Sequence, residues 1–293
     1  MSRARLVACG LAALAMCAPA FAQGKSKDPN GPNDSKKNPP PSRSDLPAAA
    51  SGVTQSSSGV TPFAWIDDAT LIEPGNVSLA VSVARWQGPG SSEVDAPIVD
   101  AALGVTPRVH FTATVPHVVG SSDALGAAGG AGTSYLGAKI ALLDPAKHQV
   151  KVSATPTIEI LGRGVVEALG TSESRVHFGL PLSAEVDHGP ARLYVGSGYF
   201  SRGIWFVGGG CGVRVNGTAF VSAVWNRSWR TADALTVQIA DRARNELTGS
   251  VSYALTPAIA VFGSVGRTIA TLDENGAGTT VAAGVALSVS PRR

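Results

Sequence analysis

The sequence predicts an all-β fold: a closed antiparallel up-and-down transmembrane β-barrel of about twelve strands, preceded by a disordered N-terminal tail. Three observations lead to this prediction. The chain of 293 residues begins with a short basic region and an apolar run. From about Thr61 onward, segments of about ten residues alternate apolar and polar side chains, which is the period of a strand with one apolar face. Long and short connections between these segments also alternate.

The first segment has the features of a secretory signal peptide. Arg3 and Arg5 precede the apolar run Leu6–Ala20, which is shorter than the roughly 20 residues of a membrane-spanning helix. Ala20-Phe21-Ala22 then supplies the small-x-small pattern at which signal peptidase cuts. We therefore expect residues 1–22 to be removed by cleavage after Ala22.

The cysteines fit the same interpretation. Met16 directly before Cys17 disfavours a lipoprotein site, and only Cys211 remains after cleavage. A lone cysteine cannot form an internal disulfide, so the fold is not a disulfide scaffold. Within a glycine-rich run, Cys211 is expected to be a small packing residue rather than a nucleophile.

Residues 23–60 have a different composition from the rest of the chain. Pro, Ser, Lys, Asn and Gly dominate, and aliphatic residues are scarce. Such a segment buries too little apolar surface to offset the entropy of ordering it. The predicted organisation is therefore a signal peptide over 1–22, a disordered tail over 23–60 and a barrel over 61–293.

Twelve strands are predicted in the barrel region, and the alternation within them assigns their faces. In His148–Leu161, for example, Val150, Val152, Ala154, Pro156, Ile158 and Ile160 alternate with Lys151, Ser153, Thr155, Thr157 and Glu159. Successive side chains of a strand point to opposite faces, so an apolar face toward lipid and a polar face toward the lumen are expected. The predicted strands are Asn76–Gln87, Pro97–Val105, Arg108–Val119, Thr133–Leu143, Gln149–Gly162, Ser174–Val186, Ala191–Phe200, Ile204–Val215, Thr218–Trp229, Asn245–Leu255, Ala258–Thr271 and Thr279–Val289.

The connections favour a membrane barrel over a soluble sandwich. Longer connections (88–96, 120–132, 163–173 and 230–244) alternate with tight ones such as Thr106-Pro107, Asn216-Gly217 and Thr256-Pro257. Only the short connection 201–203 breaks the series. Outer-membrane barrels have short periplasmic turns and longer outer loops, whereas a sandwich has no reason to keep its long loops at one end.

Aromatic residues cluster near the predicted outer ends of the strands. They are Trp86, Tyr135, Phe200, Trp205, Trp225 and Trp229. Those that face outward could form an interfacial girdle, although aromatic residues are also common in strands generally. Tyr253 is the best candidate for the inner girdle.

Three segments carry a family resemblance. Leu103–Val118 (LGVTPRVHFTATVPHV), Ser134–Asp144 (SYLGAKIALLD) and Ser250–Thr268 (SVSYALTPAIAVFGSVGRT) resemble outer-membrane barrels of the meta-pathway phenol-degradation, or transporter-like, family. The resemblance covers roughly residues 75–289. It implies passage of small molecules, hydrophobic or aromatic ones among them, through the outer membrane, and it transfers no catalytic residue. These barrels usually end on an aromatic residue that the assembly machinery recognises, whereas this sequence ends in Ser-Pro-Arg-Arg293.

The candidate site consists of polar and aromatic side chains that strand parity directs into the lumen. An Arg or Lys facing lipid near the midplane costs about 2–4 kcal/mol, which favours an inward orientation. These side chains either filter solutes or brace the lumen as a network of opposed charges. The candidates are Lys139, Lys151, Glu159, His177, Glu185, Arg192, Tyr194 and Arg214.

Other classes of function find little support. The chain has 24 basic and 21 acidic residues, which gives no electrostatic footprint for nucleic acid. The five histidines lack zinc-site spacing, and no Gly-x-Ser-x-Gly elbow occurs. We therefore predict no enzyme activity, no catalytic residues, no cofactor and no metal. Asp67-Asp68 is expected to be a solvated pair before the first strand rather than a cation site.

The predicted function is a passive conduit for small solutes, including hydrophobic or aromatic ones, in the cell outer membrane. Its expected partners are the lipid bilayer, the barrel-assembly machinery and a small-molecule solute. Two alternatives remain open from the sequence: a closed barrel with a structural or surface-binding role, and a secreted carbohydrate-binding β-sandwich.

Overall fold

The structure is a computed structural model, and it describes residues 67–88, 91–122, 130–143, 150–162, 174–201, 203–215, 217–230, 243–271 and 278–290. The predicted signal peptide (1–22) and tail (23–60) lie outside these residues. Within these ranges, no helix is long and apolar enough to cross a membrane.

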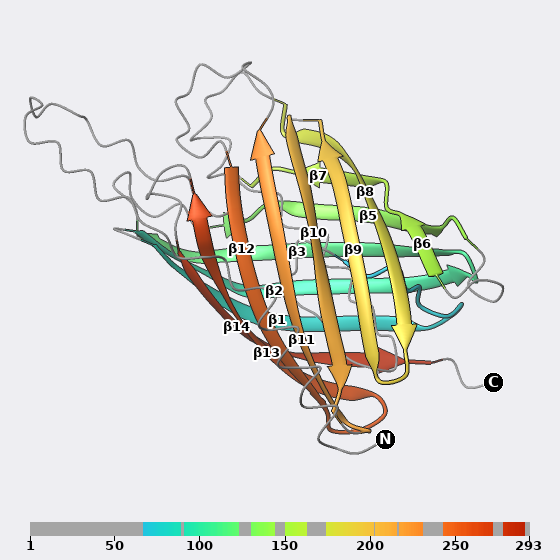
Figure 1. The fold of residues 1–293 in the computed structure, drawn as a ribbon. Coiled ribbons are helices and arrows are strands. Elements are labelled where there is room, and N and C mark those ends of the chain that lie inside the picture. Colours follow the sequence, from blue (N-terminus) through green and yellow to red (C-terminus); the bar gives the residue numbers. More distant parts are fainter. Residues whose placement is uncertain are drawn as a thin grey trace, which may run out of the picture. The chain divides into compact units, whose positions relative to one another are not determined.

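Fourteen strand segments make up the described fold (Figure 1). They are β1 (Val77–Gly88), β2 (Ser91–Thr106), β3 (Val109–Ser122), β4 (Gly130–Ala131), β5 (Ser134–Ala141), β6 (Val150–Ala154), β7 (Thr157–Ile160), β8 (Val176–His188), β9 (Ala191–Phe200), β10 (Ile204–Arg214), β11 (Ala219–Arg230), β12 (Ala243–Ala254), β13 (Ile259–Thr271) and β14 (Thr279–Val289).

The sheet closes on itself. Each strand pairs antiparallel with its neighbours in sequence, and β1 pairs with β14 from Val77↔Val289 to Gln87↔Thr279. β4 with β5, and β6 with β7, are each two parts of one strand, so the described residues form a closed barrel of twelve strands. The predicted fold class is confirmed. The alternative of a two-sheet sandwich is wrong, because the hydrogen-bonded ladder runs around a single sheet without an edge.

The largest differences from the predicted boundaries occur at two places. The strand predicted over 149–162 is split, because Thr155 and Pro156 separate β6 from β7, and a proline has no N–H to donate to the ladder. The connection predicted as long over 88–96 is short, because β2 begins at Ser91 and Ser92 pairs with Gln87. The polar Ser91-Ser92-Glu93 is typical of a loop in sequence, but pairing with β1 holds it as strand.

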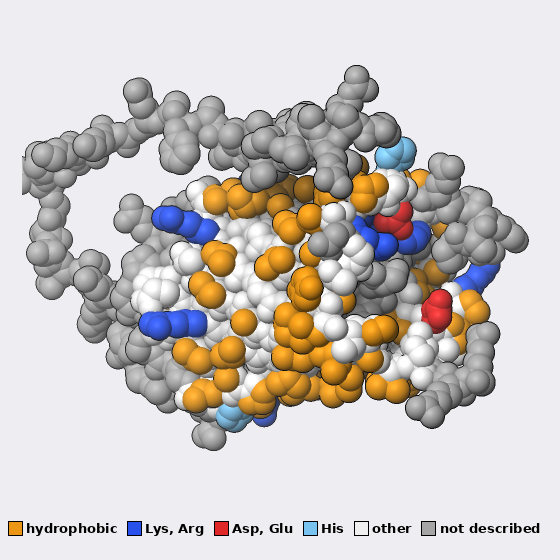
Figure 2. Space-filling view, turned by 90° about the horizontal axis from the view of Figure 1, so that it is seen from below, with side chains coloured by type: hydrophobic (Ala, Val, Ile, Leu, Met, Phe, Trp, Pro, Cys, Tyr) orange, Lys and Arg blue, Asp and Glu red, His pale blue; other side chains and the backbone are white. Residues whose placement is uncertain are grey.

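Side chains alternate across the barrel wall as the sequence predicts. In β1, Ser78 and Ala80 are 1% exposed, whereas Val81 and Val83 are 46% and 45% exposed. In β6 and β7, the polar residues from Ser153 to Glu159 are buried inside. Figure 2 shows hydrophobic side chains across the middle of one face and charged side chains toward its two ends.

The aromatic residues divide between the two faces. Trp86, Tyr135 and Phe200 are buried inside the barrel, whereas Trp205 and Trp225 are exposed on the outside. Trp205 pairs with Trp229 on β11 and packs on the outward Tyr199 of β9, with ring centroids 4.9 Å apart. An outward aromatic group therefore lies near the loop end of β9–β11, and Tyr253 is exposed near the turn end of β12.

Candidate functional site

Residues Asp67–Glu73, here called the inner segment, lie against the inner wall of the barrel before β1 begins. Asp68, Ala69 and Ile72 are 4%, 1% and 4% exposed. The backbone of Glu73 passes directly over Gly104 of β2, where a Cβ atom would overlap the Glu73 carbonyl. The N–H of Gly75 donates to the carbonyl of Gly104 (2.8 Å). The missing side chain of Gly104 therefore leaves room for the inner segment to lie against β2 inside the lumen.

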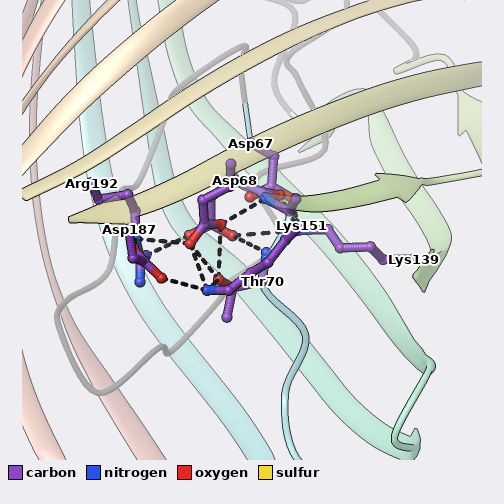
Figure 3. A network of polar contacts seen from close by, with 9 residues as sticks. Asp67, Asp68, Thr70, Lys139, Lys151, Asp187 and Arg192 are labelled. Atoms are coloured by element: carbon purple, nitrogen blue, oxygen red, sulfur yellow. Dashed lines mark hydrogen bonds and ion pairs between the residues drawn. The ribbon is translucent and has the colours of Figure 1, made fainter. Parts of the chain in front are cut away.

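The carboxylate of Asp68 bridges two cations that come from different strands of the wall, β5 and β9 (Figure 3). Nη1 of Arg192 on β9 donates to its Oδ2 at 2.9 Å, and Nζ of Lys139 on β5 lies 3.8 Å from its Oδ1. The Lys139 ammonium also donates to the backbone carbonyl of Asp68 (2.8 Å) and forms an ion pair with Asp67. Lys139 is fully buried, and a buried ammonium requires such partners.

Glu185 on β8 holds the middle of the inner segment. The N–H of Ala69 donates to Oε2 of Glu185 at 2.9 Å, and the hydroxyl of Thr70 donates to the same carboxylate at 2.8 Å. Lys151 on β6 donates to the Thr70 hydroxyl at 3.0 Å and to Glu185 at 2.9 Å. The inner segment thus donates hydrogen bonds to the carboxylate of Glu185 in the wall. Its own aspartates also form ion pairs with cations of the wall.

Further hydrogen bonds extend this network at both ends. Asp187 accepts from Lys151 at 2.7 Å and from Arg192 at 3.1 Å. Farther along the segment, the N–H of Ile72 donates to Nδ1 of His110 on β3 at 3.0 Å. Together with the contact of Glu73 on Gly104, the inner segment therefore contacts six wall strands: β2, β3, β5, β6, β8 and β9.

The expectation that Asp67-Asp68 is a solvated pair is wrong. Asp68 is buried, and both residues form ion pairs with wall cations. Burial raises the pKa of Asp68, and the neighbouring Asp67 adds to this effect, while Lys139 and Arg192 act against it. Burial therefore outweighs the two cations in setting the direction of this pKa shift.

An aromatic cluster lines the lumen next to the charged network. Tyr194 occupies the inward position after Arg192 on β9 and is paired across the ladder with Glu185. Phe200 lies between Tyr135 and Phe206, with ring centroids 6.2 Å and 6.1 Å away. These residues, with Ile204 and Val224, form one buried cluster. Glycines make room for the rings: a Cβ at Gly179 would overlap Phe200, and one at Gly210 would overlap Tyr194.

The structure brings together four of the eight candidate residues, Lys139, Lys151, Glu185 and Arg192, in the charged network. Tyr194 adjoins them. Glu159 is fully buried and accepts a hydrogen bond from the Tyr135 hydroxyl at 3.1 Å, and His177 is half-buried opposite it on β8. Arg214 is exposed at the end of β10.

Sequence reasoning missed the partners of these residues. The contact from Lys139 to Asp68 spans 71 residues, and that from Arg192 spans 124. The available signal was the apolar Ile72 close after two acidic residues, which suggests a segment that packs rather than one that is solvated. Among the described residues, no group of histidine, cysteine and acidic side chains could hold a metal ion.

Together, the fold and the internal site define a class: a closed antiparallel barrel of twelve strands among the described residues, with a chain segment bound inside. No family model matches the sequence, and no curated protein matches it. Solved structures do share the fold. The COG4313 outer membrane channel from Pseudomonas putida F1 aligns with a TM-score of 0.59 at 16% identity, covering 79% of this chain and 100% of that one. The NanC porin aligns with a TM-score of 0.51 at 11% identity, covering 71% and 98%.

Proposed function

We propose that this protein is an outer-membrane barrel that forms a passive, non-enzymatic conduit for small solutes. The observation that carries the proposal is the distribution of side chains on a closed barrel. Aliphatic residues such as Val81, Val195 and Val285 are 46%, 58% and 49% exposed on the outside, whereas Lys139 and Glu159 are fully buried inside. A soluble protein is expected to bury its aliphatic side chains and expose its charges, which is the opposite of this distribution. A barrel in a bilayer has this distribution, because its apolar side chains meet lipid and its polar side chains line the lumen.

The ends of the strands support the membrane assignment. Arg85, Arg227 and Arg267 point outward and are exposed on β1, β11 and β13. Each lies three or four residues before the loop end of its strand, where the cost of an outward arginine falls to about 0–1 kcal/mol. This is the level of the outward Trp225 and Trp229, so a basic and aromatic border frames the apolar band.

The orientation follows the usual rule for such barrels. Tight turns, such as the one at Gly189-Pro190, face the periplasm, and the inner segment leads into β1 at that end of the barrel. Secretion through the signal peptide 1–22, a periplasmic tail over 23–60 and insertion by the barrel-assembly machinery belong to this proposal. So does membership in the meta-pathway phenol-degradation, or transporter-like, family.

The lumen supports a restricted conduit rather than a wide pore. The inner segment, with Lys139, Lys151, Glu185 and Arg192, narrows the lumen toward the turn end, and the aromatic cluster narrows it from Tyr194 toward the loop end. Hydrophobic or aromatic solutes fit the side chains of this cluster. We propose that the inner segment leaves its wall site when solute passes.

The burial of the charged network also favours a second function, that of a closed barrel with a structural or surface-binding role. Lys139 and Glu185 are 0% and 1% exposed, as in a lumen that is braced rather than open. This barrel would insert in the membrane but would not pass solutes.

Two measurements in sequence test the proposal. The outer membrane is isolated from cells expressing the full chain, and the detergent extract is run on a gel with and without boiling. Recovery in the membrane, with a shift on boiling, supports the closed membrane barrel; recovery as a soluble protein without a shift refutes it. Conductance of the purified protein in planar bilayers then separates the conduit, which conducts, from the structural barrel, which does not.

A further inference from the structure

We propose that Lys139 and Arg192 form a binding site for the carboxylate of a small apolar acid, and that Asp68 of the inner segment occupies this site until such a solute displaces it. The inference deepens the proposed conduit function and rests on it, because it names the class of solute. The solute is a monocarboxylate with an aromatic or other apolar body. Figure 3 shows Asp68 between the two cations.

Asp68 shows that the site fits a carboxylate. Its two oxygens reach different cations, Oδ2 toward Arg192 at 2.9 Å and Oδ1 toward Lys139 at 3.8 Å. Both cations are side chains of wall strands, Arg192 of β9 and Lys139 of β5, and Arg192 also has partners in the wall. The guanidinium is fixed by Glu185 and Asp187, both 3.1 Å from its Nε, so Nη1 points to the same place whether or not the segment is present.

The charge balance calls for one anion. The wall part of the network has three cations, Lys139, Lys151 and Arg192, and two carboxylates, Glu185 and Asp187. If the inner segment leaves, the wall keeps one net positive charge and Lys139 loses its ion pairs with Asp67 and Asp68. A buried, uncompensated ammonium is strongly unfavourable. A solute monocarboxylate restores neutrality, whereas a neutral solute does not.

The aromatic cluster next to the two cations favours an acid whose remaining part is apolar. Tyr194 follows Arg192 on the inner face of β9, and Phe200 and Phe206 continue the aromatic cluster along the lumen. The Tyr194 hydroxyl is buried and has no hydrogen-bond partner among the described residues. This hydroxyl lies over Gly210 of β10, where it can donate to a polar group of a solute in the lumen.

The test measures binding by calorimetry to the detergent-solubilised full barrel, with phenylacetate as the acid and phenylacetamide as its neutral isostere. Asp67→Ala together with Asp68→Ala removes the side chains that occupy the site and should strengthen phenylacetate binding about 10- to 100-fold, as expected when charge-assisted hydrogen bonds are freed. Lys139→Gln should abolish the preference for the acid. Arg214→Gln, a matched loss of a cation outside the network, should leave it unchanged.

The outcomes separate this site from the conduit itself. A double variant that binds phenylacetate no better than phenylacetamide overturns the site, even if the protein conducts ions in bilayers. A barrel that prefers phenylacetate but never conducts refutes the conduit and keeps the site.

Wild-type protein provides a test that does not depend on folding of the variants. If phenylacetate displaces the inner segment, endoproteinase Asp-N should cut at Asp67 and Asp68 faster in its presence, as followed by mass spectrometry. Phenylacetamide at the same concentration should not accelerate cleavage. Equal cleavage rates with and without phenylacetate contradict the competition between solute and segment.

Discussion

Substitution of Gly104 by alanine should release the inner segment without changing any charge. A Cβ at this position would overlap the carbonyl oxygen of Glu73 and lie 2.7 Å from the carbonyl oxygen of Ile72, whereas ordinary contacts begin at 3.4 Å. These are backbone atoms, so no side-chain rotation relieves the clash. The backbone of the segment has to move away from β2.

The magnitude follows from the hydrogen bonds that this movement breaks. Gly75 donates to the carbonyl of Gly104 at 2.8 Å, and Gly104 donates to the carbonyl of Asn76 at 3.0 Å. Each contributes about 0.5–1.5 kcal/mol net. Losing both weakens docking by about 1–3 kcal/mol, which changes the ratio of docked to released segment about 5- to 150-fold.

Single-channel recording in planar bilayers is the assay, with open probability as the measured quantity. Gly104→Ala should raise open probability relative to wild type. Gly249→Ala is the matched control, because a Cβ there meets nothing within 4 Å. If both variants form heat-modifiable barrels and have the same open probability, the inner segment does not restrict the lumen and the reasoning fails.

Three further predictions concern the wall, the core and the charged network. Val195→Arg, in the middle of the outward face of β9, should destabilise the barrel in liposomes by about 2–4 kcal/mol, and Val215→Arg at the turn end should cost clearly less; equal unfolding midpoints in denaturant would contradict a lipid-facing band. Gly179→Ala should lower stability by about 1–3 kcal/mol through overpacking against the buried Phe200 ring, which the temperature of the heat shift on gels measures. Because the docked segment has a raised Asp68 pKa, it binds a proton more tightly than a released segment. Lowering the pH through the interval above the ordinary pKa of aspartic acid should therefore favour docking and lower conductance, and Asp68→Asn should flatten this dependence.

The strands and their faces could be predicted because the relevant signal is local. A period of two residues decides which side of the wall each side chain occupies, and this holds along β1, β9 and β14, whereas β2 changes phase between the buried Glu93 and Ile98, where its register shifts. The break at Pro156 was also visible in sequence, but its effect was not predicted, because the alternation of apolar and polar residues continues through it without a change of phase.

The inner segment could not be predicted because nothing local distinguishes it from a solvated linker. Asp67 and Asp68 precede the turn-forming Pro74-Gly75, which is an ordinary composition for an exposed connection. Their burial depends on cations far along the chain and on the missing side chain of Gly104. The alternation of apolar and polar residues predicted that Lys139 and Arg192 lie on the inner face. It could not predict which carboxylate binds them.

The pairing of β1 with β14 has a consequence for biogenesis. β1 pairs with β2 on one edge and with β14, the last strand, on the other. The second edge of β1 therefore has no partner within the barrel until β14 is in place. The inner segment leads directly into β1, and the side chains that bind it come from β3, β5, β6, β8 and β9. The pairing of β1 with β14 and the burial of these ionic contacts are therefore both expected late in folding. For the membrane barrel proposed above, we expect these charges to stay in water until β1 and β14 pair.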